Sequence, residues 1–271
     1  MAQETSKTLT SESLETKHRE GQENSQGKAL VLTVSPLWEG DNPKVVEAYL
    51  NAMLGQTLNN RMALFLAINE CKMKDQSEFF QTMQGWLQVH RQSFHSYSEV
   101  KYFHGRYDVP VWHPDRIEVE WRRFAQDKIR KFNIITHLWI VSGDNVPSPR
   151  ALQMLIEDDK DAVGLPCFLR NSVMPYLNIQ NWSLKPQPYL HYSEMPKNQI
   201  IEVDGLSAAC LLLKRQVVEK IDFGFTWMDL DFSLCKSIRE QGFKVYADTR
   251  EICGHANPDG TILDEKYWIG R

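Results

Sequence analysis

The sequence has few cysteines and no strong excess of charge of either sign. Its five cysteines are odd in number and include no Cys-x-x-Cys pair, so we expect neither a structural zinc site nor a disulfide framework. A reducing compartment is the simplest interpretation. The net charge of −4 provides no general positive field. Electrostatic binding of nucleic acid over the whole surface is therefore not expected.

Long apolar runs are also missing. No stretch approaches the roughly 20 apolar residues that a membrane-spanning helix needs. The first residues contain no apolar segment that resembles a secretory signal. We therefore expect a soluble, cytoplasmic protein without a transmembrane segment.

The chain is nevertheless long and apolar enough to fold. It has 271 residues, of which 42% are hydrophobic, which fits one large domain or two small ones. Residues 1–28 are polar and lack Phe, Trp and Tyr, so we expect a flexible N-terminal tail. We assign residues 29–256 to one domain. Residues 257–271 are predicted to be a C-terminal tail that covers the active site.

Apolar runs alternate with amphipathic segments in the first half of the chain. The pattern predicts strands at 29–34, 62–68, 100–103, 134–141, 162–165 and 244–247, and helices from 43, at 76–92, 118–132, 149–158 and 229–241. Residues 171–200 are rich in Asn, Pro and Tyr and favour surface loops or hairpins. The order indicates an α/β fold with a mostly parallel sheet, helices on both faces and a mixed second half.

Three polar residues follow predicted strands or begin a predicted helix. Asp144 comes after the strand 134–141, His255 follows the last strand, and Asp229 stands at the start of the helix 229–241. Open α/β sheets bind ligands beyond the carboxyl ends of their strands. We therefore expect these three side chains to converge on a metal ion and a diphosphate.

Five segments, taken in order, resemble the GT-A-fold glycosyltransferases, most closely those of the broad family 2 type. They are residues 31–36, residues 54–57 (Leu-Gly-Gln-Thr), residues 138–152, residues 204–215, and residues 228–234 with 242–248 and Gly254-His255. The resemblance covers about residues 29–256. It implies a Rossmann-like, mixed but mostly parallel central sheet with helices on both faces.

The resemblance also implies an activity, the transfer of a sugar from a nucleotide-diphosphate donor to an acceptor hydroxyl with inversion. Such a reaction places negative charge on the leaving phosphate, which Mn²⁺ or Mg²⁺ neutralises. Asp144 is the first candidate ligand and His255 the second, and an imidazole shifts the preference toward Mn²⁺. The alternative for each is structural: a turn aspartate and a hydrogen-bonded histidine.

The acceptor hydroxyl needs a base, and Asp229 is the candidate. The alternative is a capping box, with Thr226 as the first residue of the cap and Asp229 three positions later. The two roles are geometrically compatible. The sequence does not identify the acceptor: a glycan, a protein, a small molecule or a modified nucleobase all fit. It does not determine the oligomeric state either.

The donor nucleotide is expected at the edge formed by the first two strands. Ser35, Pro36, Asn69 and Glu70 are the candidate contacts for its base and ribose, with surface loops as the alternative for the last two. Arg123, in the basic helix 118–132, is the candidate contact for the diphosphate. The alternative for that arginine is a solvated basic face.

The chain departs from the family pattern at two positions. Ser142 stands where the first acid of the Asp-x-Asp motif is expected, and Met228 stands where an acid often precedes Asp229. The Gln-x-x-Arg-Trp motif of processive synthases is absent, which favours a single transfer. Two alternatives stay open: a non-catalytic nucleotide-sugar-binding protein, and a nucleotidyltransferase, although the Gly-rich basic loop of the latter is missing after the first strand.

Overall fold

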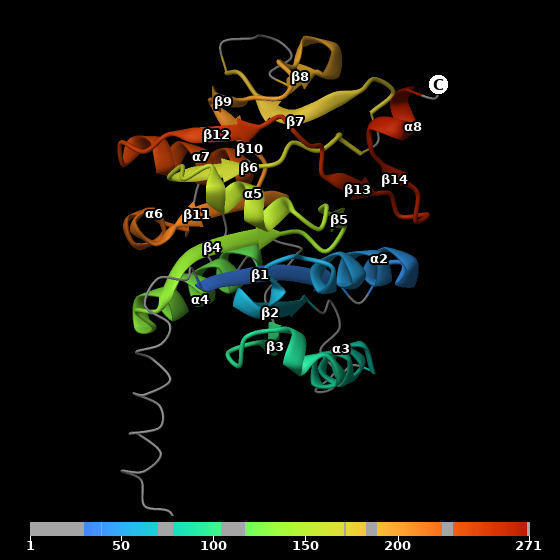
Figure 1. Ribbon diagram of the computed structural model, residues 1–271, viewed down its shortest axis with the longest axis vertical. Coiled ribbons are helices and arrows are strands. Elements are labelled where there is room, and N and C mark those ends of the chain that lie inside the picture. Colours follow the sequence, from blue (N-terminus) through green and yellow to red (C-terminus); the bar gives the residue numbers. More distant parts are fainter. Residues whose placement is uncertain are drawn as a thin grey trace, which may run out of the picture.

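The computed structural model describes residues 30–38, 40–69, 78–103, 117–170, 172–182, 189–223 and 230–269 (Figure 1). The predicted tail 1–28 lies outside these residues. Eight strands form the central sheet. In spatial order the strands are β3 (Glu99–Phe103), β2 (Met62–Asn69), β1 (Leu30–Trp38), β4 (Ile135–Val141), β11 (Cys210–Lys214), β6 (Ala162–Gly164), β12 (Val245–Asp248) and β9 (Ile200–Val203).

The sheet is mixed but mostly parallel. The strands β3, β2, β1 and β4 run parallel to one another, and β6 and β12 form a second parallel pair. Between these groups β11 is antiparallel to both of its neighbours, and β9 is antiparallel to β12 at the edge. The predicted fold class is confirmed.

Helices cover both faces of this sheet. On one face α2 (Pro43–Leu54), α3 (Glu78–Val89) and α5 (Ala151–Glu157) pack in one apolar cluster with Val31 and Leu64. On the other face α4 (Ile117–Lys131), α6 (Arg215–Lys220) and α7 (Leu230–Glu240) pack in a second cluster with Leu32 and Phe65. Because both faces are covered, β2 is buried along its whole length, which explains its continuous apolar run.

Two smaller sheets and three 3₁₀ turns complete the described residues. One sheet has the order β10 (Gly205–Leu206), β7 (Tyr176–Gln180) and β8 (Tyr189–His191); the other has β14 (Ile262–Leu263), β13 (Gly254–Ala256) and β5 (Asn145–Val146), and α8 (Glu265–Ile269) ends the chain. The turns are η1 (Asn59–Arg61), η2 (Arg91–Ser93) and η3 (Tyr192–Glu194). No helix in the described part of the chain has the length and apolar character to cross a bilayer.

Two predicted boundaries are wrong. The first strand was expected to end at residue 34, but β1 continues to Trp38, and Pro36 pairs in register with Ala67 of β2. The helix expected to start at Ser148-Pro149 begins at Ala151. Ser148 does not cap it, because its hydroxyl donates a hydrogen bond to Glu251.

Candidate functional site

A cleft of about 880 Å³ opens at the carboxyl ends of β1 and β2. Pro36, Leu37 and Trp38 of β1 and Asn69 of β2 form one side of it. The turn after β4, Arg170 and residues 256–258 also line it. This is the position at which open α/β sheets bind ligands, and the volume is that of a small-molecule site.

The turn that carries Asp144 lies directly against the end of β1. The backbone N–H of Gly143 donates to the Pro36 carbonyl oxygen at 3.1 Å, and that of Ser142 donates to Ala209 at 3.0 Å. A side chain at position 143 would meet Leu37 and would lie 2.7 Å from the Pro36 carbonyl oxygen. The close approach that fixes Asp144 at the cleft therefore requires glycine.

Gly143→Ala should lower the free energy of unfolding by about 1–3 kcal/mol, because the methyl group meets backbone that cannot move cheaply. The turn should also shift Asp144 away from the cleft and weaken nucleotide binding. Urea unfolding and calorimetric titration measure the two effects. Gly85→Ala is the matched control, since a methyl group there meets nothing within 4 Å on α3 and should stabilise the helix by up to about 1 kcal/mol. Equal stability of the two variants would contradict the prediction.

Two side chains from other parts of the sequence, those of Arg170 and His255, meet at Asp144. Its Oδ2 atom lies 2.8 Å from Nη1 of Arg170 and 3.4 Å from Nε2 of His255. Strand pairing explains the second contact, because β13 runs antiparallel to β5 and the Ala256 N–H donates to the Asp144 carbonyl oxygen at 2.7 Å. The His255 ring is held from its other side, where Nδ1 donates to the Phe168 carbonyl oxygen at 2.7 Å.

The electrostatics keep this cluster charged. Burial opposes ionisation of Asp144, but the hydrogen bond and charge of His255 and the charge of Arg170 outweigh it, so the pKa of Asp144 is lowered. Burial also opposes charging of His255, but the Cys167 sulfur and the Asp144 carboxylate raise the pKa of His255 to about 10. In the protein alone, Asp144 is therefore ionised and faces two cationic groups at neutral pH.

A second carboxyl group lines the cleft. Asp41 accepts a hydrogen bond from the Trp38 N–H at 3.1 Å. Burial raises the pKa of Asp41, and the nearby negative charge of Asp144 adds to that effect, while the Trp38 N–H and Arg170 oppose it. Two acids and one arginine thus share the part of the cleft next to Trp38.

The predicted donor contacts are only partly brought together. Pro36 and Asn69 line the cleft with Asp144. Asn69 is 3% exposed, and its Oδ1 atom has no hydrogen-bond partner among the described residues. Ser35 is placed elsewhere: its hydroxyl is fully buried and bonded to the hydroxyl of Tyr49 on α2.

The remaining predicted residues do not reach the cleft or are not described. Arg123 is exposed on α4 and is not among the residues that line the cleft. Glu70 and Asp229 lie outside the described residues. Asp231, two positions after the predicted base, forms an ion pair with the buried Arg122 of α4 at 3.1 Å.

Sequence reasoning missed Arg170 and Asp41. It sought the phosphate-binding cation on the basic helix 118–132, whereas Arg170 follows the apolar run 165–169 in the second half of the chain. A lone arginine directly after a buried run was the available signal. Asp41 stands two residues before Pro43 at the start of α2, where an acid looks like an ordinary turn residue.

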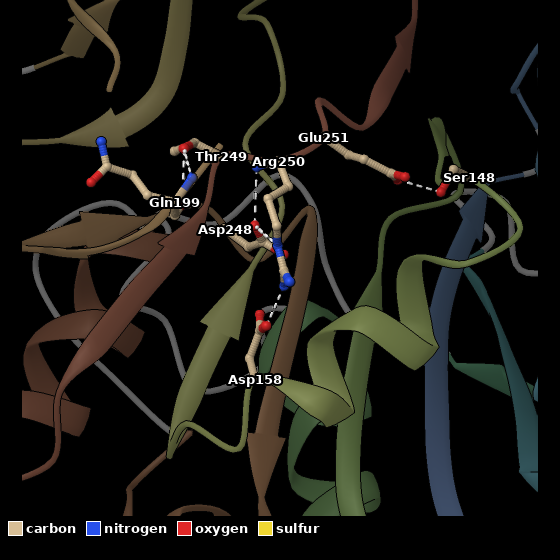
Figure 2. A network of polar contacts seen from close by, with 7 residues as sticks. All are labelled: Ser148, Asp158, Gln199, Asp248, Thr249, Arg250 and Glu251. Atoms are coloured by element: carbon tan, nitrogen blue, oxygen red, sulfur yellow. Dashed lines mark hydrogen bonds and ion pairs between the residues drawn. The ribbon is translucent and has the colours of Figure 1, made fainter. Parts of the chain in front are cut away.

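A polar network fixes the connection between β12 and His255 (Figure 2). Arg250 donates from Nε and Nη2 to the two carboxylate oxygens of the fully buried Asp248, at 2.8 and 2.6 Å, and also contacts Asp158. Thr249 donates to the Gln199 carbonyl oxygen at 2.8 Å. Figure 2 shows the Arg250 guanidinium lying between the two aspartates. The segment that leads to His255 is thereby anchored to both α5 and β9.

The chemistry of Asp144 and His255 fits a divalent cation. Within the described ranges no group of three or more His, Cys, Asp or Glu side chains has metal-binding geometry. The 3.4 Å between Asp144 Oδ2 and His255 Nε2 nevertheless suits two ligands of one ion, which lie about 3 Å apart when each is bound at about 2.1 Å. The Phe168 carbonyl holds the proton on Nδ1, as the second partner of a metal-bound histidine commonly does.

Comparison with known proteins identifies the fold but no family. No protein-family model matches the sequence, and no curated protein does. Among solved structures, TarS of S. aureus, whose fold is GT-A-like, matches with a TM-score of 0.51 and 11% identity, over 83% of this chain and 36% of TarS. This chain therefore spans about a third of TarS. The resemblance to the GT-A fold is confirmed, and membership of family 2 stays a prediction.

Two further structures match less well. A197 from STIV has a TM-score of 0.47 and 13% identity over 87% of this chain and 93% of A197. The inositol-1-phosphate CTP transferase from T. maritima has a TM-score of 0.48 and 11% identity over 82% of this chain and 86% of that enzyme. At such identities a structural likeness concerns the fold alone.

Proposed function

We propose that this protein transfers a sugar from a nucleotide-diphosphate sugar to an acceptor hydroxyl, with inversion at the sugar. One observation carries the proposal. Asp144, which lines a cleft of about 880 Å³ on the carboxyl edge of a GT-A-like sheet, lies 3.4 Å from His255, a residue 111 positions later in the sequence. The GT-A-like fold supports the reaction class, and the residues of the cleft support the roles below.

The nucleoside of the donor lies against the ends of β1 and β2. Pro36 and the half-exposed Trp38 present apolar surface there, and a flat ring suits contact with a base. Asn69 supplies a buried Oδ1 atom that lacks a partner among the described side chains. An unpaired buried acceptor costs free energy, which a donor group on the bound base or ribose recovers.

Asp144 and His255 are the residues that would hold Mn²⁺ or Mg²⁺ beside the diphosphate of the donor. When bound, the ion supplies Lewis-acid stabilisation of the charge on the leaving diphosphate. The lowered pKa of Asp144 keeps its carboxylate ionised and ready to bind a cation. Because Phe168 fixes the Nδ1 proton, His255 gives up its proton at Nε2, the atom that faces Asp144.

Asp229 accepts the proton of the acceptor hydroxyl. The residue directly precedes α7, whose start is tied to α4 by the ion pair between Asp231 and Arg122 at 3.1 Å.

Asp229→Asn should lower the transfer rate by about 10²–10⁴-fold, because a general base typically contributes that much. Binding of the donor should be unchanged. Transfer is followed by release of the nucleotide diphosphate, and donor binding by calorimetry. If Asp229 serves only as a cap, the transfer rate of the variant stays near that of the wild type and only the unfolding free energy changes.

The activity itself is tested with a panel of nucleotide sugars in Mn²⁺, with release of nucleotide diphosphate as the signal. Release that stops on addition of EDTA supports the proposal. Binding of nucleotide without turnover, with every acceptor offered, identifies a non-catalytic binding protein. Release of inorganic pyrophosphate from a nucleoside triphosphate identifies a nucleotidyltransferase.

A further inference from the structure

Arg170 lines the cleft, and the segment that precedes it is held by several backbone contacts. Its backbone follows two isolated bridges, Cys167 with Cys253 and Phe168 with Leu177, and the Leu169 N–H donates to Tyr176 at 2.9 Å. From this anchored segment its side chain, 37% exposed, reaches Asp144 and lines the cleft. The guanidinium is therefore held by the fold at the carboxylate and is open to ligands.

One carboxylate oxygen of Asp144, Oδ2, contacts both Arg170 and His255. Arg170 Nη1 lies 2.8 Å from Oδ2, and His255 Nε2 lies 3.4 Å from that atom. A divalent cation held between Asp144 and His255 would use this oxygen, because it is the one that faces Nε2. The cation and the guanidinium then compete for it, because a carboxylate oxygen bound to a doubly charged ion is a poor acceptor for a second cation that lies so close.

The charges that line the cleft give Arg170 a second partner. Among the described lining residues, Asp41, Glu118 and Asp144 are acidic, and Arg170 is the single arginine or lysine. A diphosphate entering this cleft meets mainly negative charge. A planar guanidinium binds phosphate oxygens in a bidentate manner, so Arg170 is the protein's own group best suited to receive the diphosphate.

We propose that Arg170 is an exchangeable internal cation: it holds Asp144 when no divalent ion is bound, and the ion displaces it onto the diphosphate of the donor. This inference rests on the function proposed above. It goes further by assigning to Arg170 two opposite effects, since the arginine weakens binding of the divalent ion and strengthens binding of the diphosphate. Binding of the ion and binding of the nucleotide therefore promote each other.

Two binding measurements on the full chain test the exchange. Free Mn²⁺, followed by electron paramagnetic resonance, gives the affinity for the ion alone; calorimetry with uridine diphosphate and with guanosine diphosphate, at saturating Mn²⁺, gives the affinity for the nucleotide. Arg170→Met should bind Mn²⁺ about tenfold more tightly than the wild type and should bind the preferred nucleotide about tenfold or more weakly. A merely structural arginine does not produce opposite changes of this kind.

Two further variants complete the design. Arg170→Lys keeps the charge and should bind Mn²⁺ close to the wild-type affinity, with a partial loss of nucleotide affinity because lysine is not bidentate. Arg123→Met removes an exposed cation that does not line the cleft and should change neither affinity. Thermal unfolding of each variant checks the fold. If Arg170→Met does not fold, an Arg170→Lys variant that keeps the wild-type nucleotide affinity would contradict the exchange.

The outcomes separate this inference from the function on which it rests. If the wild type binds Mn²⁺ and one nucleotide, and Arg170→Met leaves the Mn²⁺ affinity unchanged or weaker, the exchange is wrong and the proposed function stands. If the wild type binds neither Mn²⁺ nor either nucleotide, the proposed function and the exchange both fail.

Discussion

Asp144→Asn should abolish sugar transfer, with a loss of about a thousandfold or more in the rate of nucleotide diphosphate release. The variant keeps the size of the side chain and removes only its charge. That charge is the partner of both Arg170 and His255, and in the function proposed above it is also the anionic ligand of the divalent ion. Without it, two cationic groups at 2.8 and 3.4 Å lose their shared counterion, and the free variant should no longer bind Mn²⁺ at this site.

The control for this variant is Asp127→Asn. Asp127 is an exposed aspartate of α4, with a side chain that is 75% exposed and a contact of 4.0 Å to Arg130. It is not among the cleft-lining residues, so the same chemical change there should leave activity within twofold or so of the wild type. Substantial activity in Asp144→Asn, at wild-type Mn²⁺ concentration, would falsify the assignment of Asp144 as a ligand.

The backbone of this site was predictable because its signals are local. The continuous apolar runs of β1 and β2 predict buried parallel strands, and the polar turn after β4 predicts Asp144 at the sheet edge. The pairing of Asp144 with His255 needed the resemblance as well, since it depends on β13 returning to pair with β5.

Ser35, which was predicted to contact the donor, shows what a short sequence pattern cannot determine. Its predicted role assumed that the first strand ended at residue 34. Because β1 continues to Trp38, Ser35 alternates in phase with Val31 and Leu37 and faces the helices that include α2. Alternation along a strand determines the face on which Ser35 lies, but only when the strand is known to extend past that residue.

Arg170 was missed for a non-local reason. Its position depends on the bridge between Cys167 and Cys253, which joins segments more than 80 positions apart. Spacing along the sequence carries no information on such a contact. The basic residues of α4 gave a stronger local signal, yet Arg122 pairs with Asp231 and Arg123 remains exposed.

Arg250→Met should strongly destabilise the protein, although the arginine is partly exposed. Asp248 is fully buried, and the side chain of Asp158 is 2% exposed; both share the Arg250 guanidinium (Figure 2). Removing one partner of a buried ion pair leaves an uncompensated charge, which costs about 3–5 kcal/mol. Because the arginine is 39% exposed, water reaches the site, and we expect a loss of about 3 kcal/mol at pH 7.5.

The loss of unfolding free energy in Arg250→Met should depend on pH, and the direction of this dependence follows from the pKa of Asp158. Its pKa is raised to about 6, first by burial and then by the charge of Asp248, with Arg250 opposing both. A carboxyl group with a raised pKa favours the folded state below its unfolded value of 3.8 and loses that contribution as the pH rises through about 6. Without Arg250 the Asp158 carboxyl gains a proton more readily, so the loss of unfolding free energy at pH 5 should be smaller than at pH 7.5.

Urea unfolding of the wild type and of Arg250→Met at both pH values measures this difference. Arg150→Met, at an exposed arginine that supplies no side-chain cap to α5, is the matched control and should change stability by less than about 0.5 kcal/mol. If Arg250→Met loses the same unfolding free energy at pH 5 and at pH 7.5, water rather than Arg250 stabilises the charges of the carboxylates. A larger deficit at pH 7.5 would show that the guanidinium holds two buried charges at the start of the segment that carries His255. Activity lost together with stability would then connect this network to the cleft.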